Sequence, residues 1–129
     1  MSAINNETFI LVVDDQNTNI DLITRMLART KHKVITAFDG VEACQILQEI
    51  TPALILSDIM MPNMDGYSLL KEVRANPLLA NVPFVFLSAK GNALDVQQGI
   101  TLGADDYLVK PFRPQELFEL VDRHLSARA

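Results

Sequence analysis

The sequence contains no tryptophan, a single cysteine, no long hydrophobic run and no block of five like charges. The lone Cys44 cannot form an internal disulfide, so a disulfide-stapled fold is excluded and an inert reduced thiol is the simplest interpretation. No apolar stretch approaches the roughly 20 residues that a membrane-spanning helix needs. Residues 1–8 also lack the basic and apolar regions of a signal peptide. These absences predict a cytoplasmic protein without membrane contact.

Basic character is scarce as well, since the formal net charge is −5 and the isoelectric point is about 4.8. Direct binding to nucleic acid needs a basic surface that displaces counterions, so this composition disfavours it. The chain has 129 residues, of which 49% are hydrophobic and 21% charged, which suits one folded domain with one sizeable core. No internal repeat or low-complexity segment indicates a second unit.

Five short apolar runs predict β-strands. They lie at residues 9–13, 33–37, 53–58, 82–87 and 107–109. The central run follows Pro52 and opens with four consecutive apolar residues, which is typical of a strand buried on both faces of a parallel sheet. Asp58 ends this run, at the point where open α/β sheets place their ligand chemistry. Asp58 is therefore the candidate reactive group.

Segments with helical periodicity separate the strands. Their boundary signals are a cap at Asn17 or Thr18, an Asp39–Glu42 capping box, Asp65-Gly66 before the third helix, Gly103 after the fourth and Pro114 at the start of the fifth. The apolar residues that recur at helical spacing are Ile20, Ile23 and Leu27; Ala43, Ile46, Leu47 and Ile50; Leu69, Leu70 and Val73; Ala93, Val96 and Ile100; and Leu117, Leu120, Val121 and Leu125.

Five strands alternating with five helices predict an α/β fold in which a five-stranded parallel sheet is covered by helices on both faces. Right-handed crossovers favour the strand order 2-1-3-4-5, which is the flavodoxin-like, doubly wound, three-layer arrangement. In this order the carboxyl ends of the first, third and fourth strands are adjacent.

Polar residues follow four of the predicted strands at that edge: Asp14, Asp15, Asp58, Ser88 and Lys110. Three neighbouring carboxylates would raise one another's pKa unless a cation lay among them. An all-oxygen site with an open position suits Mg²⁺. Such an ion, together with the ammonium of Lys110 and the hydroxyl of Ser88, could stabilise a phosphoryl group that is transferred to a carboxylate. The expected product is an aspartyl phosphate on Asp58.

These motifs resemble, in order and spacing, those of the receiver domain of two-component response regulators. The matching motifs are Asp14-Asp15, Asp58 with Met61-Pro62 and Asp65-Gly66, Ser88-Ala89, Gly103-Ala104-Asp105-Asp106-Tyr107 and Lys110-Pro111-Phe112. The resemblance covers roughly residues 9–125. We therefore expect residues 1–129 to form a single receiver domain with a core at about 9–125.

The resemblance implies a role for each site residue. Asp58 would accept the phosphoryl group from a phosphohistidine on a sensor histidine kinase or a phosphotransfer protein. Asp15, the Asp58 side chain and the Met60 backbone carbonyl would hold Mg²⁺, and Asp14 would act largely through water. Lys110 would pair with Asp58 or its phosphate. The Lys110–Pro111 peptide bond would be cis.

The resemblance also implies a switch. Phosphorylation would draw the Ser88 hydroxyl inward and allow Tyr107 to rotate, so that the surface of the fourth helix, fifth strand and fifth helix reports the state to a downstream effector. Phosphorylation-dependent homodimerisation is a further family-level expectation. The chain would be a phosphoacceptor signalling domain, not an enzyme acting on an external substrate, and would assist its own phosphotransfer and dephosphorylation.

Met60 and Lys90, each two residues beyond Asp58 and Ser88, are expected at the mouth of the pocket. An acidic or amide side chain there could orient an attacking water, which Met60 cannot do. The hypothesis is therefore a comparatively long-lived phosphoryl group. Ser88 in place of the commoner threonine keeps the hydroxyl that the switch needs.

Three other function classes are alternatives to this one. A flavodoxin-like electron carrier needs a first loop that cradles phosphate, and Asp14-Asp15 would repel it. A haloacid-dehalogenase-type phosphatase needs a second Asp two positions after the first, where Gln16 or Asn17 stands. A phosphorylation-independent receiver-like interaction module is the strongest alternative. The output stays open: the chain is a stand-alone regulator or a receiver cut from a longer protein, N-terminal in it if Met1 is the native start.

Overall fold

The computed structural model describes residues 9–89 and 93–125, without the side chains of Ser88 and residues 93–96. Its elements are β1 (Phe9–Val13), α1 (Asn17–Leu27), β2 (Lys33–Ala37), α2 (Gly40–Leu47), β3 (Leu54–Asp58), α3 (Gly66–Ala75), β4 (Phe84–Ala89), α4 (Ala93–Thr101), β5 (Asp106–Lys110) and α5 (Pro114–Leu125). The alternation predicted from the sequence is confirmed element by element. None of the helices in these two ranges is long and apolar enough to cross a membrane.

The five strands form one parallel sheet in the order β2-β1-β3-β4-β5, as predicted. The register aligns the carboxyl ends of neighbouring strands: Val13 lies opposite Ser57, Asp58 opposite Leu87, and Ala89 opposite Lys110. Residues that follow these strands consequently emerge at one edge of the sheet.

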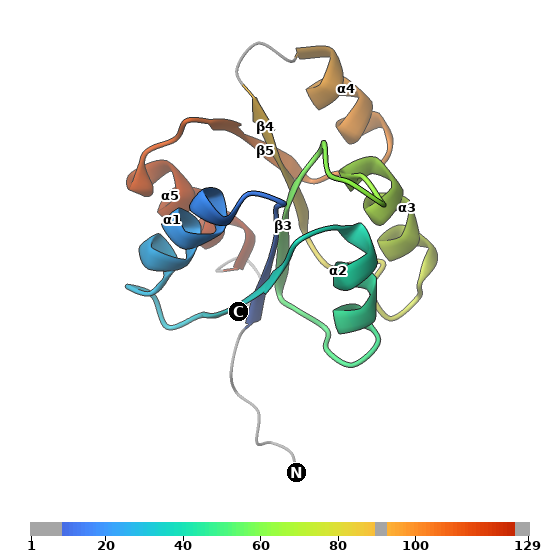
Figure 1. Cartoon of the computed structure of the whole chain (residues 1–129), viewed down its shortest axis with the longest axis horizontal. Coiled ribbons are helices and arrows are strands. Elements are labelled where there is room, and N and C mark those ends of the chain that lie inside the picture. The colour runs from blue at the N-terminus through green and yellow to red at the C-terminus, as the bar shows by residue number, and fades with distance from the viewer. Residues whose placement is uncertain (1–8, 90–92, 126–129) are drawn as a thin grey trace.

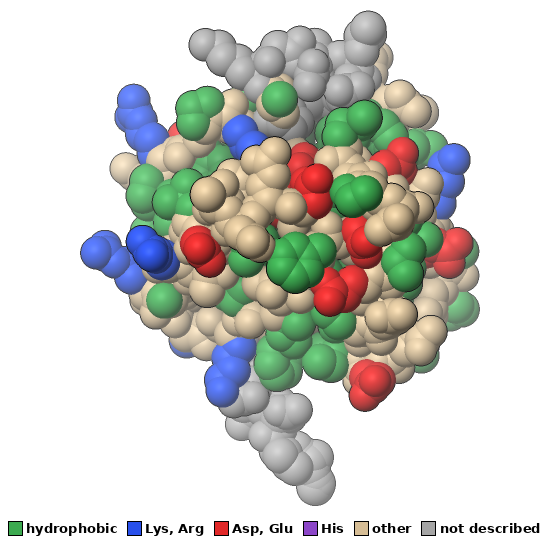
Figure 2. Space-filling view, viewed as in Figure 1, with side chains coloured by type: hydrophobic (Ala, Val, Ile, Leu, Met, Phe, Trp, Pro, Cys, Tyr) green, Lys and Arg blue, Asp and Glu red, His purple; other side chains and the backbone are tan. Residues whose placement is uncertain are grey.

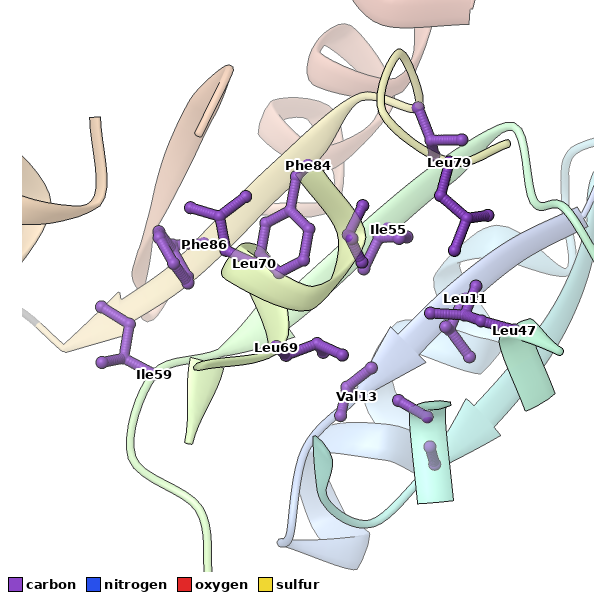
Figure 3. Close-up of a cluster of buried hydrophobic side chains, with 14 residues drawn as sticks. Leu11, Val13, Leu47, Ile55, Ile59, Leu69, Leu70, Leu79, Phe84 and Phe86 are labelled. Carbon is purple, nitrogen blue, oxygen red and sulfur yellow. The ribbon is translucent and has the colours of Figure 1, made fainter. Parts of the chain in front are cut away.

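Helices cover both faces of the sheet. Successive residues of each strand point to opposite faces, so the apolar strands present apolar side chains on both faces. Figure 1 shows α1 and α5 on one side and α2 and α3 on the other. On the α2–α3 side, Leu11 and Val13 of β1 pack with residues of β3, β4 and both helices. Figure 3 shows this cluster: Leu70 of α3 lies close to Phe84 and Phe86 of β4, and Leu47 of α2 lies beside Leu11 of β1.

The opposite face buries the alternate residues of the same strands. Ile10 and Val12 of β1 pack with residues of β3 and β4 against α1 and α5. The central strands β1 and β3 are almost entirely buried, which explains their unbroken apolar runs. Because helices pack on both faces of the sheet, the strands are held in place. The positions of the residues at the strand ends are therefore fixed.

Several element boundaries differ from the prediction. β4 begins at Phe84 and not at Val82, because Val82 closes a turn in which its N–H donates to Leu79 O at 3.0 Å. The residue that caps α1 is Gln16, since Asn17 and Thr18 already belong to the first turn, and no side-chain cap bond forms there. α2 ends at Leu47, so Ile50 lies beyond it.

The caps of α2 and α3 follow the sequence prediction. Asp39 Oδ1 accepts from Glu42 N, and Asp65 Oδ1 accepts from Ser68 N, both at 2.8 Å. The reciprocal bond of the predicted capping box is displaced by one residue, because Glu42 accepts from Phe38 N (2.6 Å). Gly103, two residues after α4, has φ +112°, a conformation that suits glycine.

Candidate functional site

Four of the residues selected from the sequence meet at the carboxyl edge of the sheet. Asp14 and Asp15 follow β1, Asp58 is the last residue of β3, and Lys110 is the last residue of β5. The backbone N–H of Asp14 donates to Ala37 O of β2 at 3.0 Å, which continues the β1–β2 pairing past the strand end. The sheet therefore fixes the direction in which these side chains leave the backbone.

The three aspartates form a compact acidic cluster. One carboxylate oxygen from each of Asp14, Asp15 and Asp58 lies within 4.8 Å of the others. Asp14 is fully buried at 0% exposure, Asp58 is partly buried and Asp15 is exposed, so the cluster opens to solvent on one side. Figure 2 shows acidic side chains across the middle of this view of the molecule, with Lys and Arg side chains around its edge.

Lys110 supplies the positive charge of the cluster. Its Nζ lies 3.2 Å from Asp14 Oδ2 and 3.5 Å from Asp58 Oδ2, and its side chain is 23% exposed. Asp14 Oδ1 accepts a second bond, from the backbone N–H of Gln16 at 2.9 Å. The buried Asp14 carboxylate thus has a partner on each oxygen. The Lys110–Pro111 peptide bond is cis, the isomer that the family resemblance implies.

The environment of Asp58 opposes its charge. Burial raises the pKa of Asp58, and the neighbouring Asp14 raises it further, whereas the ammonium of Lys110 and the N–H of Ile59 lower it. The Ile59 N–H donates to Asp58 Oδ1 at 2.8 Å, which leaves Oδ2 facing Lys110. An added cation would relieve the remaining repulsion between carboxylates.

The first turn of α3 lies directly on the backbone of Asp58. Gly66 N donates to Ile59 O at 2.8 Å, and a Cβ built on Gly66 would lie 2.3 Å from the carbonyl oxygen of Asp58. Only glycine permits this approach. Asp65-Gly66 is among the motifs on which the family resemblance rests, but only the structure shows the contact that requires the glycine.

The loop after Asp58 is attached to the start of α2, which sequence reasoning missed. Asn63 Nδ2 donates to Asp39 Oδ2 at 2.6 Å, and Gly40 N donates to Met64 O at 3.2 Å. Asn63 has φ +67°, a left-handed conformation that asparagine tolerates better than most residues. Met60 in the same loop is 72% exposed, in keeping with the expected position at the mouth of the site.

The remaining selected residues lie outside the acidic cluster or outside the described part. Ser88 is paired with Val109 in the β4–β5 ladder, but its side chain is outside the described residues, as is the whole of Lys90. Tyr107 lies in β5 opposite Phe86, and its side chain is exposed. Ile100, Tyr107 and Val109 are exposed apolar residues of α4 and β5.

The donor set fits a hard divalent cation. Three carboxylates supply oxygen ligands, one of them is solvent-exposed, and a lysine ammonium balances part of their charge. Mg²⁺ prefers oxygen ligands and retains several waters, which suits a cluster that is open on one side. Asp15, Asp58 and Asp14 are the described side chains that could contribute to such a site.

Comparisons with known proteins all find receiver domains or response regulators. Residues 10–122 match the family described as the response regulator receiver domain. The chain is 42% identical over 112 residues to a probable transcriptional regulator, ycf27, of Cyanophora paradoxa, which covers 87% of this chain and 46% of that protein. A crystal structure of a putative response regulator from Chloroflexus aurantiacus is 36% identical, with a TM-score of 0.90, and covers 94% of this chain and 99% of that one.

A second solved structure contains a metal ion. It is the receiver domain of a sensor histidine kinase from Pseudomonas aeruginosa PAO1, with a magnesium ion coordinated in the active site cleft. It is 32% identical to this chain with a TM-score of 0.86, and the match covers 93% of this chain and 98% of that one. The chain spans about half the length of the sequence relatives that it matches, such as 46% of the ycf27 protein.

Proposed function

The chain belongs to the response regulator receiver domain family, and from that premise we propose that it accepts a phosphoryl group on Asp58 in a Mg²⁺-dependent reaction. The donor is a phosphohistidine of a sensor histidine kinase or of a phosphotransfer protein. Residues 1–129 act as one receiver domain, and the phosphorylated state is recognised by a downstream effector protein or domain.

The observation that carries this proposal is the position of Lys110. Its Nζ lies 3.2 Å from Asp14 and 3.5 Å from Asp58, two of the three carboxylates whose oxygens lie within 4.8 Å of one another. The buried Asp14 needs a compensating charge in any case, but the same ammonium also faces the partly buried Asp58. A site that receives a phosphoryl group needs a nucleophilic carboxylate and a cation for the phosphoryl oxygens in one place.

The transfer is a substitution at phosphorus. A carboxylate oxygen of Asp58 attacks the phosphorus of the phosphohistidine, a P–O bond forms and the P–N bond breaks. The imidazole nitrogen leaves with the bonding electron pair and takes up a proton. Lys110 stays beside Asp58 and donates to the phosphoryl oxygens, while Ser88 supplies a hydroxyl donor from the end of β4.

Asp15, the Asp58 side chain and the backbone carbonyl of Met60 would hold Mg²⁺, with Asp14 acting largely through water. The ion would neutralise negative charge on the transferring phosphoryl group. Asp15 is exposed and Asp58 is partly buried, whereas both oxygens of the buried Asp14 already accept bonds, which supports this division of roles.

The output surface is formed by α4, β5 and α5. We propose that phosphorylation draws the Ser88 hydroxyl toward the phosphate and that Tyr107 then rotates into the vacated space. The exposed side chains of Ile100, Tyr107 and Val109 support a partner-binding role for this face. Phosphorylation-dependent homodimerisation through α4 and α5 is one form that such binding would take.

The proposal predicts one added phosphate after incubation with Mg²⁺ and acetyl phosphate, measured as intact mass. Here the P–O bond to the acetyl group breaks and acetate leaves. Asp58→Asn removes the nucleophile and should carry no phosphate, and EDTA should prevent phosphorylation of the wild type. Equal modification of Asp58→Asn, or of the wild type in EDTA, would contradict the proposal.

Met60 should make the phosphoryl group long-lived, because its exposed thioether side chain cannot orient a water. Hydrolysis requires water to attack phosphorus, break the bond to Asp58 and release inorganic phosphate. Met60→Asn should accelerate this step on the order of tenfold by positioning the water. The loss of added mass after removal of the donor measures the rate. Met60→Leu is the matched control, and an unchanged rate in Met60→Asn would refute the idea.

A further inference from the structure

Residues 59–65 link the phosphorylation site to α3, and we refer to them as the 59–65 loop. One end of the loop is closed by the bond from Gly66 N to Ile59 O at 2.8 Å. Its tip is tightened by the bond from Met64 N to Pro62 O at 2.7 Å. Met60 lies between Asp58 and this tip, so the position of its carbonyl depends on how the tip is held.

The tip is held by α2, which contributes no residue to the acidic cluster. Asp39, the residue that caps α2, uses one carboxylate oxygen for each element: Oδ1 accepts from Glu42 N at 2.8 Å, and Oδ2 accepts from Asn63 Nδ2 at 2.6 Å. We call the second bond the Asp39–Asn63 latch. A bond between an amide and an ionised carboxylate is stronger than one between neutral groups.

The backbone beside the latch adds a second attachment. Gly40 N donates to Met64 O at 3.2 Å, and a Cβ on Gly40 would lie 2.8 Å from that oxygen. Asn63 itself has φ +67°, so the latch holds the tip in a conformation that most residues adopt only at a cost. The tip of the loop therefore contacts α2 through its cap residue Asp39, through Gly40 and through the side chain of Cys44, whose Sγ lies 3.9 Å from Met64 Sδ.

We propose that Asp39 and Asn63 are positioning residues for the metal: the latch fixes the 59–65 loop and thereby the Met60 carbonyl, and so sets the Mg²⁺ affinity of the site. This inference rests on the proposed function, in which Met60 is a metal ligand. Groups that orient the ligands of a metal typically change its affinity by 10–100-fold when they are removed. The latch acts one step further away, so the low end of that range applies.

Two substitutions cut the latch without disturbing the rest of either element. Asn63→Gly removes the amide, preserves the net charge and suits a φ of +67°. Asp39→Ser keeps an oxygen that can cap α2 at Glu42 N but is too short to reach Asn63. Isothermal titration calorimetry of the full chain with MgCl₂ measures the dissociation constant in the absence of any phosphodonor.

Each single variant should bind Mg²⁺ about tenfold more weakly than the wild type. The double variant should also be about tenfold weaker, and not hundredfold, because both substitutions remove the same bond. A role limited to overall stability would not produce this non-additive pattern in metal affinity. Thermal melts of the same proteins in EDTA show whether each variant is folded at the titration temperature.

Asn76→Gly is the matched control. Asn76 Oδ1 accepts from Leu78 N at 2.9 Å, so this Asn→Gly change also removes a loop hydrogen bond, but at the opposite end of α3. Its Mg²⁺ affinity should equal that of the wild type. Three results would contradict the proposed role of the latch. They are wild-type Mg²⁺ affinity in the latch variants, additive losses of affinity in the double variant, and an equal loss of affinity in Asn76→Gly.

The titration of the wild-type chain distinguishes a failure of the latch from a failure of the proposed function. If the wild-type chain binds Mg²⁺ and accepts a phosphoryl group while Asn63→Gly binds the metal equally well, the latch is wrong and the proposed function stands. If the wild-type chain binds no Mg²⁺, the proposed function fails, and the latch fails with it.

Discussion

Gly66→Ala should destabilise the fold by about 3 kcal/mol, the upper end of the usual cost of overpacking, and should strongly reduce phosphorylation of Asp58. The added Cβ would lie 2.3 Å from the carbonyl oxygen of Asp58 and 3.0 Å from both Ile59 Cα and a ring carbon of Phe86. Two of these three neighbours are backbone atoms, so no side-chain rotation relieves the clash. Either α3 or the backbone of Asp58 has to move.

Urea unfolding measures the stability change, and the added mass after acetyl phosphate treatment measures the effect on the site. Ser68→Ala, an exposed change in the same first turn, is the control and should alter stability by no more than about 0.5 kcal/mol, because the bond to Asp65 uses the Ser68 backbone N–H. Wild-type stability and phosphorylation in Gly66→Ala would show that the close approach of α3 is not required.

Lys110→Met should lower the free energy of unfolding by about 3 kcal/mol in EDTA, and saturating Mg²⁺ should restore most of it. The substitution preserves most of the side-chain volume but removes the cation that lies 3.2 Å from the fully buried Asp14. Breaking a buried pair is costly because the remaining charge stays uncompensated. A divalent cation among the same carboxylates would replace the missing charge.

The pH dependence of this variant follows from Asp58. Burial raises the pKa of Asp58 and the Lys110 ammonium opposes that rise, so Lys110→Met should raise the pKa further. A carboxyl whose pKa is higher in the folded than in the unfolded state favours folding at low pH, and this contribution is lost as the pH rises through the folded-state pKa. The stability deficit of Lys110→Met in EDTA should therefore grow as the pH is raised through that range.

Arg123→Met is the control for charge removal. Arg123 pairs with Asp106 at 2.6 Å, but its side chain is 60% exposed, so the loss should stay below about 1 kcal/mol and should not respond to Mg²⁺. Urea unfolding of both variants, in EDTA and in Mg²⁺, makes the comparison. Two results would contradict this account: Lys110→Met is as stable as the wild type in EDTA, or Mg²⁺ does not raise the free energy of unfolding of the variant. Either result would mean that the ammonium and the metal do not neutralise the same carboxylates.

The fold could be predicted from the sequence because its signals are strong and local. The unbroken apolar run before Asp58 indicates a strand buried on both faces, and Gly103 marks the end of α4 by its backbone freedom. The convergence of Asp14, Asp58 and Lys110 followed from the strand order alone. Boundaries are less predictable: the apolar run predicts a strand that begins at Val82, which belongs to a turn.

Long-range polar contacts away from the strand ends could not be predicted, because nothing in a single sequence pairs their members. Asn63 donates a hydrogen bond to Asp39, which lies 24 positions earlier in the sequence. Arg74 of α3 donates to Val82 O at 2.8 Å, to Gly103 O at 2.9 Å and to Asp105 Oδ2 at 2.7 Å, and so ties the ends of three elements together. From the sequence, Arg74 is only a basic residue near the end of a helix.

The most direct test of the central claim is to locate the phosphoryl group. After treatment with Mg²⁺ and acetyl phosphate, borohydride reduces an aspartyl phosphate to homoserine, and peptide mass spectrometry then identifies the altered position. The proposal predicts homoserine at residue 58 alone, and none in a control treated with EDTA. Homoserine at Asp14 or Asp15 would contradict the assignment of Asp58. No modification, even with a phosphohistidine donor, would instead indicate an interaction module that works without phosphorylation.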